Sequence, residues 1–146
     1  KMKEVIWSLN TENDSLGNLL SYLQKQARQM MENYPGSFTI TIPEQIPDIK
    51  IGGETRRHIY LTVKEALHNI IKHSGADKIN LVIACAGKLI IKVSDNGKGM
   101  NTGDSSNSGN GLKNMRNRME QIGGNFSVEN NQGLTLIFEI PLKPAL

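Results

Sequence analysis

Three stretches of the chain repeat hydrophobic residues at the spacing of an amphipathic α-helix: residues 15–32, 54–74 and 112–122. Asn13 or Asp14 is the expected N-cap of the first helix, and Gly75 ends the second. The Gly123-Gly124 pair ends the third. The pattern therefore predicts three helices of ordinary length.

Between these helices the hydrophobic residues alternate with polar ones, which is typical of strands. The strands predicted in this way cover residues 37–43, 78–84 and 88–94, with two more within 125–141. Residues 43–53 and 97–111 have loop composition, and residues 1–10 form an entry segment or a short helix. The order of elements predicts one α+β domain of two layers, with the helices on one face of a sheet.

The amino-acid composition argues against a membrane-spanning segment in this chain and against a nucleic-acid-binding protein. The chain of 146 residues is 38% hydrophobic and 21% charged, and no hydrophobic run approaches the roughly 20 residues of a membrane helix. Its net charge of +3 is scattered, and aromatic residues make up 5%, which argues against a nucleic-acid partner. The single cysteine, Cys85, fits a reducing compartment. Because the chain begins at Lys1 and not at methionine, we expect a piece of a longer protein.

The second helix carries an unusual set of polar residues on one side. Thr62, Glu65, Asn69 and Lys72 gather opposite its hydrophobic stripe. A solvated face is one interpretation of this pattern. The other is a binding site, because the carboxylate of Glu65 and the carboxamide of Asn69 are oxygen ligands that suit Mg²⁺. Lys72 adds a positive charge one turn further on, which suits a phosphate.

The segment Asp95-Asn96-Gly97 is a strong signal for a two-residue hairpin turn. A hairpin would require a strand to resume near Lys98, but ten residues of loop composition follow Met100. The segment is therefore predicted to be a strand-end turn that opens a long loop. Asp95 would then place an acceptor carboxylate at the end of a strand, within reach of a base amino group.

A second pair of glycines, Gly109 and Gly111, directly precedes the third predicted helix. Free backbone N–H groups at a helix start favour phosphate binding. Lys113, Arg116 and Arg118 either reinforce such a site or form a solvated basic face. The chain matches neither the GxxxxGK[ST] pattern nor GxGxxG, which excludes both a P-loop and a Rossmann fingerprint.

Taken together, these segments resemble the ATP-binding domain of sensor histidine kinases, whose Bergerat fold is shared with DNA gyrase and Hsp90. The segment KEALHNIIKHS is similar to the N box of the subgroup with short ATP lids. DNGKGM resembles the first glycine box, and GNGLKNMRNRMEQIGG resembles the second. IWSLNTENDSLGNLLSYL is similar to the segment that links the dimerisation helices to the ATPase domain.

The resemblance implies a role for each matching residue. Asn69 would coordinate Mg²⁺ on the ATP phosphates, and Glu65 would polarise a water or help activate the reaction. Asp95 would accept a hydrogen bond from the adenine amino group, and residues 98–110 would form a lid. The positions implied in nucleotide binding are Asn69, Lys72, His73, Asp95, Gly97, Gly99, Met100, Gly109, Asn110, Gly111, Leu112 and Thr135.

The implied fold is a two-layer α+β sandwich, with a mixed, mostly antiparallel sheet of about five strands and three helices on one face. The implied cofactors are ATP and Mg²⁺. Residues 1–10 would be the tail of the dimerisation helix, and residues 11–146 the catalytic domain. The partners would be the upstream phosphoacceptor domain of the same protein, which forms a homodimer, and a response-regulator receiver domain. The expected location is the cytoplasmic part of a membrane-anchored sensor.

Two features depart from the family pattern. The Gly-Thr pair that helps bind adenine reads Gly133-Leu134-Thr135 here. The acceptor histidine of the subgroup stands in a Leu-His-Asp context, whereas His68 stands in Leu-His-Asn inside the N box. We therefore predict that His68 is not phosphorylated, that the acceptor lies upstream of Lys1, and that this chain alone does not autophosphorylate.

Two other functions are compatible with the same fold. One is a serine kinase that acts on a regulatory protein, although the linker-like segment near Trp7 argues against it. The other is a nucleotide-binding module without phosphotransfer. The presence of Glu65, Asn69 and Asp95 together argues against a decayed site.

Overall fold

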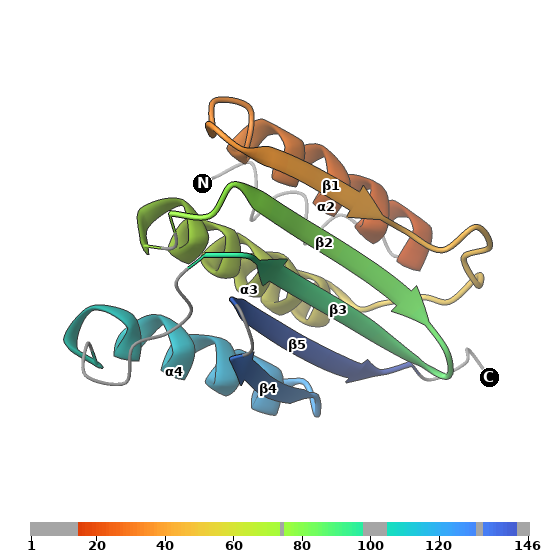
Figure 1. The fold of residues 1–146 in the computed structure, drawn as a ribbon. Helices are drawn as coiled ribbons and strands as arrows, with labels where there is room; N and C mark the ends of the chain where they lie inside the picture. The colour runs from red at the N-terminus through yellow and green to blue at the C-terminus, as the bar shows by residue number, and fades with distance from the viewer. Residues whose placement is uncertain (1–14, 74, 98–104, 131–132, 143–146) are drawn as a thin grey trace.

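The structure is a computed structural model that describes residues 15–73, 75–97, 105–130 and 133–142, with the backbone alone at residue 73 and at residues 105–110. The predicted entry segment, residues 1–10, lies outside the described residues. The described helices and strands, labelled as in Figure 1, are α2 (Leu16–Met30), β1 (Ser37–Thr41), α3 (Gly53–His73), β2 (Lys78–Cys85), β3 (Lys88–Asp95), α4 (Ser105–Gln121), β4 (Asn125–Asn130) and β5 (Leu134–Pro141).

The strands form one mixed sheet in the order β1-β2-β3-β5-β4. β1 runs parallel to β2, and the other three pairs are antiparallel. β2 and β3 join through a tight turn in which Gly87 has a φ of +74°, a conformation that favours glycine. β3 is the middle strand, with seven residues paired to each of its two neighbours.

The core lies between the sheet and three helices that cover one of its faces (Figure 1). On β2 and β3 buried and more exposed residues alternate, so one face of the sheet is packed and the other meets water. Ile79, Leu81 and Val93 are among the fully buried residues on the packed face. The predicted two-layer α+β sandwich with a mixed, mostly antiparallel sheet is confirmed.

The first helix, α2, begins at Leu16, which is one residue later than an N-cap at Asp14 and two later than an N-cap at Asn13 would give. Ser15 is the N-cap, and its hydroxyl accepts a hydrogen bond of 3.1 Å from the N–H of Asn18. The prediction of Asn13 or Asp14 was therefore wrong, because the serine hydroxyl already satisfies this helix end. The buried side of α2 consists of Leu16, Leu19, Leu20, Leu23 and Ala27, as its periodicity predicted.

The last helix, α4, begins at Ser105, about seven residues earlier than the hydrophobic pattern predicted. The loop predicted for residues 97–111 is thus wrong from residue 105 onward. Residues 105–111 contain only Ser, Asn and Gly, so no apolar periodicity can report a helix there. The end of α4 follows the prediction, since Gly123 has a φ of +74° and the N–H of Gly124 bonds the carbonyl of Met119 at 2.7 Å.

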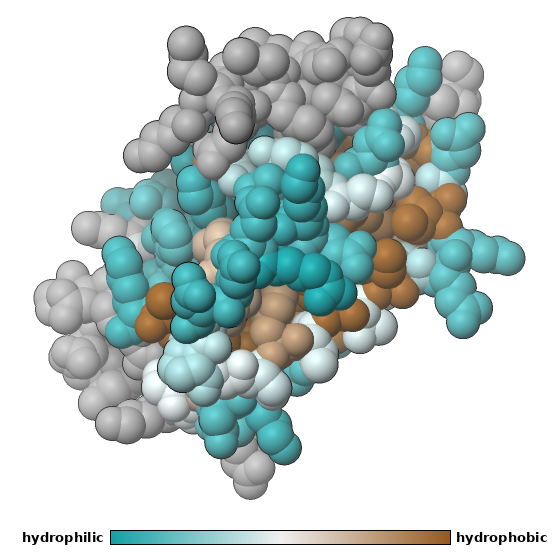
Figure 2. Space-filling view, turned by 90° about the horizontal axis from the view of Figure 1, so that it is seen from above, coloured by the Kyte–Doolittle hydropathy of each residue, from teal (hydrophilic) through white to brown (hydrophobic). Residues whose placement is uncertain are grey.

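Among the residues coloured by hydropathy in Figure 2, hydrophilic ones alternate with patches of hydrophobic ones. Among the described residues, Ile71 is the large hydrophobic side chain classed as exposed, at 38%. In the described part of the chain, no helix has the length and apolar character needed to span a membrane.

One side of the domain collects the elements that carry the predicted site. Figure 1 shows the end of β3, the starts of β2 and β5, the C-terminal end of α3 and the N-terminal end of α4 on the same side. The register agrees, because Ile79 near the start of β2 pairs with Asp95 at the end of β3. Residues far apart in the sequence are therefore brought to one side of the domain by the sheet order.

A substitution at Gly124 should test the packing of α4 onto the sheet. A Cβ at Gly124 would lie 2.6 Å from the carbonyl oxygen of Glu139, which is backbone of β5 and cannot rotate away. We expect Gly124→Ala to lower the free energy of unfolding by about 1–3 kcal/mol, measured by urea titration with circular dichroism. Gly17→Ala, within α2, is the control, because a Cβ at this position would lie 4.0 Å from Ser15 Oγ, an ordinary van der Waals distance. It should be neutral or stabilising, and equal losses in both variants would contradict the steric explanation.

Candidate functional site

The polar side of α3 faces α4 at very close range. A Cβ built on Gly111 of α4 would lie 2.8 Å from Asn69 Nδ2 and 2.9 Å from Glu65 Oε1. Asn69 Oδ1 would be 3.3 Å away from the same point. Only glycine leaves room here without a shift of these side chains, so Gly111 brings the backbone of α4 against the carboxylate and the carboxamide.

The four residues of the polar face of α3 differ in solvent exposure. Thr62 is 1% exposed, and its hydroxyl oxygen has no hydrogen-bond partner among the described residues. Glu65 and Asn69 are half-buried, whereas Lys72 is exposed. The solvated-face interpretation therefore applies to Lys72 and not to Thr62, Glu65 and Asn69.

The Asp95 carboxylate is held at the end of β3 by backbone donors. The N–H of Gly97 donates to Asp95 Oδ1 at 2.8 Å, and the N–H of Leu134 also donates to this carboxylate. Burial raises the pKa of Asp95, and the two backbone hydrogen bonds oppose that rise. A carboxylate offers about four acceptor positions, so two N–H donors leave capacity for a further donor.

The start of β5 lies directly against this turn. Gly133 has a φ of +128°, and a Cβ there would overlap the carbonyl oxygen of Asp95. Thr135 is paired with Ser94, and paired residues of neighbouring strands point to the same face of a sheet. Thr135 therefore lies on the outer face, whereas Asp95 lies on the helix face. The structure does not bring Thr135 to the other predicted site residues.

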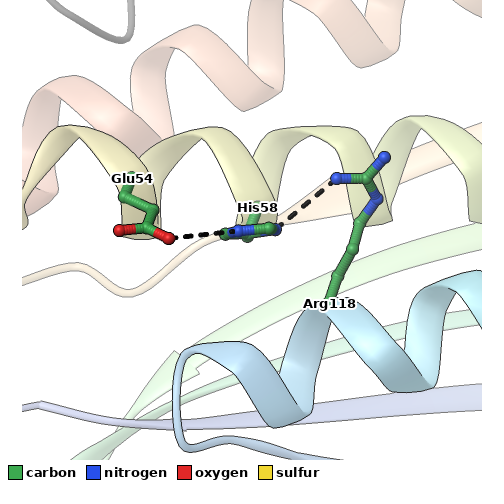
Figure 3. A network of polar contacts seen from close by, with 3 residues as sticks. All are labelled: Glu54, His58 and Arg118. Atoms are coloured by element: carbon green, nitrogen blue, oxygen red, sulfur yellow. Dashed lines mark hydrogen bonds and ion pairs between the residues drawn. The ribbon is translucent and has the colours of Figure 1, made fainter.

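A polar network joins the first half of α3 to the end of α4 (Figure 3). Arg118 Nη1 lies 3.5 Å from His58 Nδ1, and His58 Nε2 lies 3.8 Å from Glu54 Oε1. Burial lowers the pKa of His58, and the charge of Arg118 lowers it further, while Glu54 acts in the opposite direction. With Arg118 as the donor to Nδ1, the neutral ring carries its proton on Nε2, which faces Glu54.

Residues 54–144 match the family model described as histidine kinase-, DNA gyrase B- and HSP90-like ATPase. The chain belongs to this ATPase family. The matched span contains Glu65, Asn69, Asp95 and Gly111. The predicted family is therefore confirmed, whereas the subgroup with short ATP lids stays a prediction.

Two curated relatives are named as a sensor histidine kinase and as a sensor protein. The chain is 30% identical over 126 residues to the sensor histidine kinase LiaS of Bacillus subtilis, covering 84% of this chain and 35% of the relative. It is 31% identical over 88 residues to the sensor protein VraS of Staphylococcus aureus, covering 60% of this chain and 25% of the relative. The chain thus spans about a third or less of these relatives.

A solved structure supports the fold. The histidine kinase domain of a blue-light activated histidine kinase from Erythrobacter litoralis superposes with a TM-score of 0.72 at 24% sequence identity. The alignment covers 85% of this chain and 61% of that chain. At this identity the likeness establishes the shared ATPase fold alone.

Several predicted site residues of the ATPase domain have no described side-chain geometry. Gly99 and Met100 lie outside the described residues, and the side chain of His73 is not described. Gly109 and Asn110 lie within the backbone of α4. Because α4 begins at Ser105, both Gly109 and Gly111 lie beyond the four residues whose N–H groups are free at a helix start, and the prediction that they precede the helix was wrong. Leu112 is half-buried beside it.

The described residues offer few protein ligands for a metal ion. In these ranges no group of three His, Cys, Asp or Glu residues could hold one. Glu65 Oε1 and Asn69 Oδ1 nevertheless both lie close to the same point beside Gly111. This donor set fits Mg²⁺, which commonly takes one or two protein oxygens together with phosphate oxygens and water.

Sequence reasoning missed several contacts around the site. Arg118 and Arg116 were candidates for phosphate binding, but Arg118 contacts His58 and Arg116 lies 5.2 Å from the centre of the Phe126 ring. The side chain of Asn96 bonds to the start of β2. No sequence signal could have revealed these partners, because each joins elements that only the fold brings together.

The His58 network should make stability sensitive to acid. Because the pKa of His58 is lowered in the fold, the unfolded chain binds its proton at a higher pH than the folded chain. Stability is therefore lost as pH falls below the ordinary histidine pKa and through the lowered one. We expect the Tm of the wild type to fall more between pH 7 and pH 5 than the Tm of His58→Gln, measured by circular dichroism. His68→Gln, exposed on the same helix, is the control, and equal slopes for His58→Gln and wild type would contradict the assignment.

Proposed function

We propose that this chain is the ATP-binding catalytic domain of a sensor histidine kinase. It binds Mg-ATP and donates the γ-phosphate to a histidine on an upstream dimerisation helix, for relay to an aspartate of a response regulator. The observation that carries the proposal is the convergence of Glu65 and Asn69 on Gly111, within a domain of the histidine kinase-like ATPase family. The name of the relative LiaS, a sensor histidine kinase, supports the choice of reaction.

Each site residue has a chemical role in this proposal. The Asp95 carboxylate accepts a hydrogen bond from the adenine amino group, which gives preference for adenine. Asn69 provides an oxygen to Mg²⁺, whose charge neutralises the phosphates when it is bound. Glu65 accepts a hydrogen bond from a water or from the attacking group. Phosphoryl transfer needs positioning and charge stabilisation above all, and these residues supply both without a covalent step on the chain.

The exposed Lys72 and the half-buried Leu112 complete the proposed nucleotide surface. Lys72 lies one turn beyond Asn69 and places its charge toward the phosphates. We retain His73, Gly99, Met100, Gly109 and Asn110 as proposed contacts. Thr135 is not retained, because its register places it on the other face of the sheet.

The proposal extends to the parent protein, of which this chain would be one part. The acceptor histidine lies in a dimerisation domain upstream, and the full-length protein is a homodimer. A receiver domain of a response regulator accepts the phosphoryl group. Because ATP and receiver domains occur in the cytoplasm, we place this domain on the cytoplasmic side of a membrane-anchored sensor.

Removal of the Asp95 carboxylate should weaken binding of ATP. We expect Asp95→Ala to raise the Kd for Mg-ATP by about 10- to 100-fold in isothermal titration calorimetry, since a hydrogen bond to a charged group is lost. Asp48→Ala, in an exposed loop, is the control and should bind as wild type does. Because burial raises the pKa of Asp95, the advantage of wild type should shrink as pH falls through that raised pKa. Equal affinities of wild type and Asp95→Ala would refute the adenine assignment.

Phosphotransfer should require both a separate acceptor domain and Asn69. The chain alone should show little or no autophosphorylation with labelled ATP. Addition of the purified upstream histidine domain should give a labelled acceptor with wild type and with the control Asn125→Ala, but not with Asn69→Ala. Transfer that persists in Asn69→Ala would refute the metal role. Binding of ATP without any transfer would favour a nucleotide-binding module instead.

A further inference from the structure

The side chain of Asn96 ties the turn after β3 to the start of β2. Asn96 Oδ1 accepts hydrogen bonds from the N–H groups of Asp77, at 3.1 Å, and Lys78, at 2.9 Å. Asn96 Nδ2 donates to Asp77 Oδ1 at 2.6 Å. The chemistry fixes this orientation of the amide, because backbone N–H groups only donate and a carboxylate only accepts. Three hydrogen bonds from one exposed side chain are more than a turn requires.

The backbone of the same residue is bound to the same strand. The N–H of Asn96 donates to the carbonyl of Lys78 at 3.2 Å. The residues on either side of Asn96 are Asp95 and Gly97, and Gly97 donates to the Asp95 carboxylate at 2.8 Å. The position of that carboxylate therefore depends on how the 95–97 turn is held.

The other end of this bridge is itself anchored. The carbonyl of Asp77 accepts hydrogen bonds from Ser37 at the start of β1, from the N–H at 2.8 Å and from Oγ at 3.3 Å. A Cβ on Gly36 would lie only 2.8 Å from the same carbonyl oxygen. Asp77 thus belongs to a closely packed junction of β1 and β2, and Asn96 fastens the turn to this junction.

We propose that Asn96, with Asp77 as its partner, is a positioning residue that sets the Asp95 carboxylate for reading the adenine amino group. The inference rests on the proposed function, in which Asp95 accepts a hydrogen bond from the adenine amino group. An asparagine is not needed for the turn alone, since Asp-Gly and Gly-Gly make similar turns. The carboxamide oxygen accepts from two backbone N–H groups while its nitrogen donates to a carboxylate, a combination that neither a glycine nor an ionised aspartate at this position could make.

The test compares two nucleotides that differ at the group Asp95 would read. In inosine diphosphate a carbonyl oxygen replaces the amino group of adenosine diphosphate. Binding of each, with Mg²⁺, is measured by calorimetry on the 146-residue chain. We expect Asn96→Ala to raise the Kd for adenosine diphosphate by about tenfold and the Kd for inosine diphosphate much less. The preference for adenine, which is the ratio of the two Kd values, should therefore fall. Asn125→Ala, at an exposed position of the edge strand β4, should keep the wild-type preference.

An exchange of the two partners makes the test independent of a general loss of folding. Asn96→Asp sets two carboxylates against each other and should lower the preference for adenine as Asn96→Ala does. Asp77→Asn retains an acceptor oxygen for Asn96 and should have a small effect. The double variant Asn96→Asp/Asp77→Asn restores the bridge with donor and acceptor exchanged, and it should recover most of the preference.

Three outcomes would overturn the proposal: an unchanged preference in Asn96→Ala, an equal loss for both nucleotides, or no recovery in the double variant. Asp95→Ala separates this failure from failure of the proposed function. If Asp95→Ala loses the adenine preference while the Asn96 variants keep it, Asp95 reads the base without help from Asn96. If Asp95→Ala keeps the preference, both assignments are wrong.

Discussion

The register of β3 between β2 and β5 is the constraint on which the site depends. Side chains along a strand alternate between faces, so a shift of one residue would move Asp95 to the outer face and Ser94 to the helix face. Hydrophobic residues hold the register, because Leu89, Ile91 and Val93 are each fully buried on the face that the helices cover. The packing of these three side chains thus decides which polar group at the end of β3 faces the helix layer.

Packing also determines which side of α3 faces α4. The hydrophobic stripe of α3, including Ile59, Val63 and Leu67, is buried against the sheet, and its polar side then has to meet α4. A larger residue than glycine at position 111 would displace Glu65 and Asn69. The His58 and Arg118 contact joins the same two helices further along. Packing on one side of α3 and close approach on the other therefore place two oxygen-bearing side chains at one point.

The helices, the strands and the candidate site residues could be predicted from the sequence, but the hydrogen-bond partners of those residues could not. Alternation and helical spacing predicted the strands and most of each helix, because the hydrophobic residues that create those patterns also form the core. The pattern failed at residues 105–111, where Ser, Asn and Gly extend α4 without any apolar side chain. It also failed at Ser15, where one hydroxyl group and not a pattern sets the helix start. Asn96 was interpreted as a turn former, and its three side-chain hydrogen bonds depend on a strand that begins 18 residues earlier.

Asp95 shows that the site and the stability of the fold make opposite demands. A folded-state pKa above the unfolded value means that the ionised carboxylate costs stability at neutral pH, and that this cost disappears as pH falls through the raised pKa. An apolar residue would suit this end of the sheet better, since the partner of Asp95 on β2 is the buried Ile79. The N–H groups of Gly97 and Leu134 offset part of the cost without saturating the carboxylate. The Asp95 carboxylate thus accepts two backbone hydrogen bonds and keeps acceptor positions free at the end of the central strand. This is the arrangement expected of a group that binds a ligand.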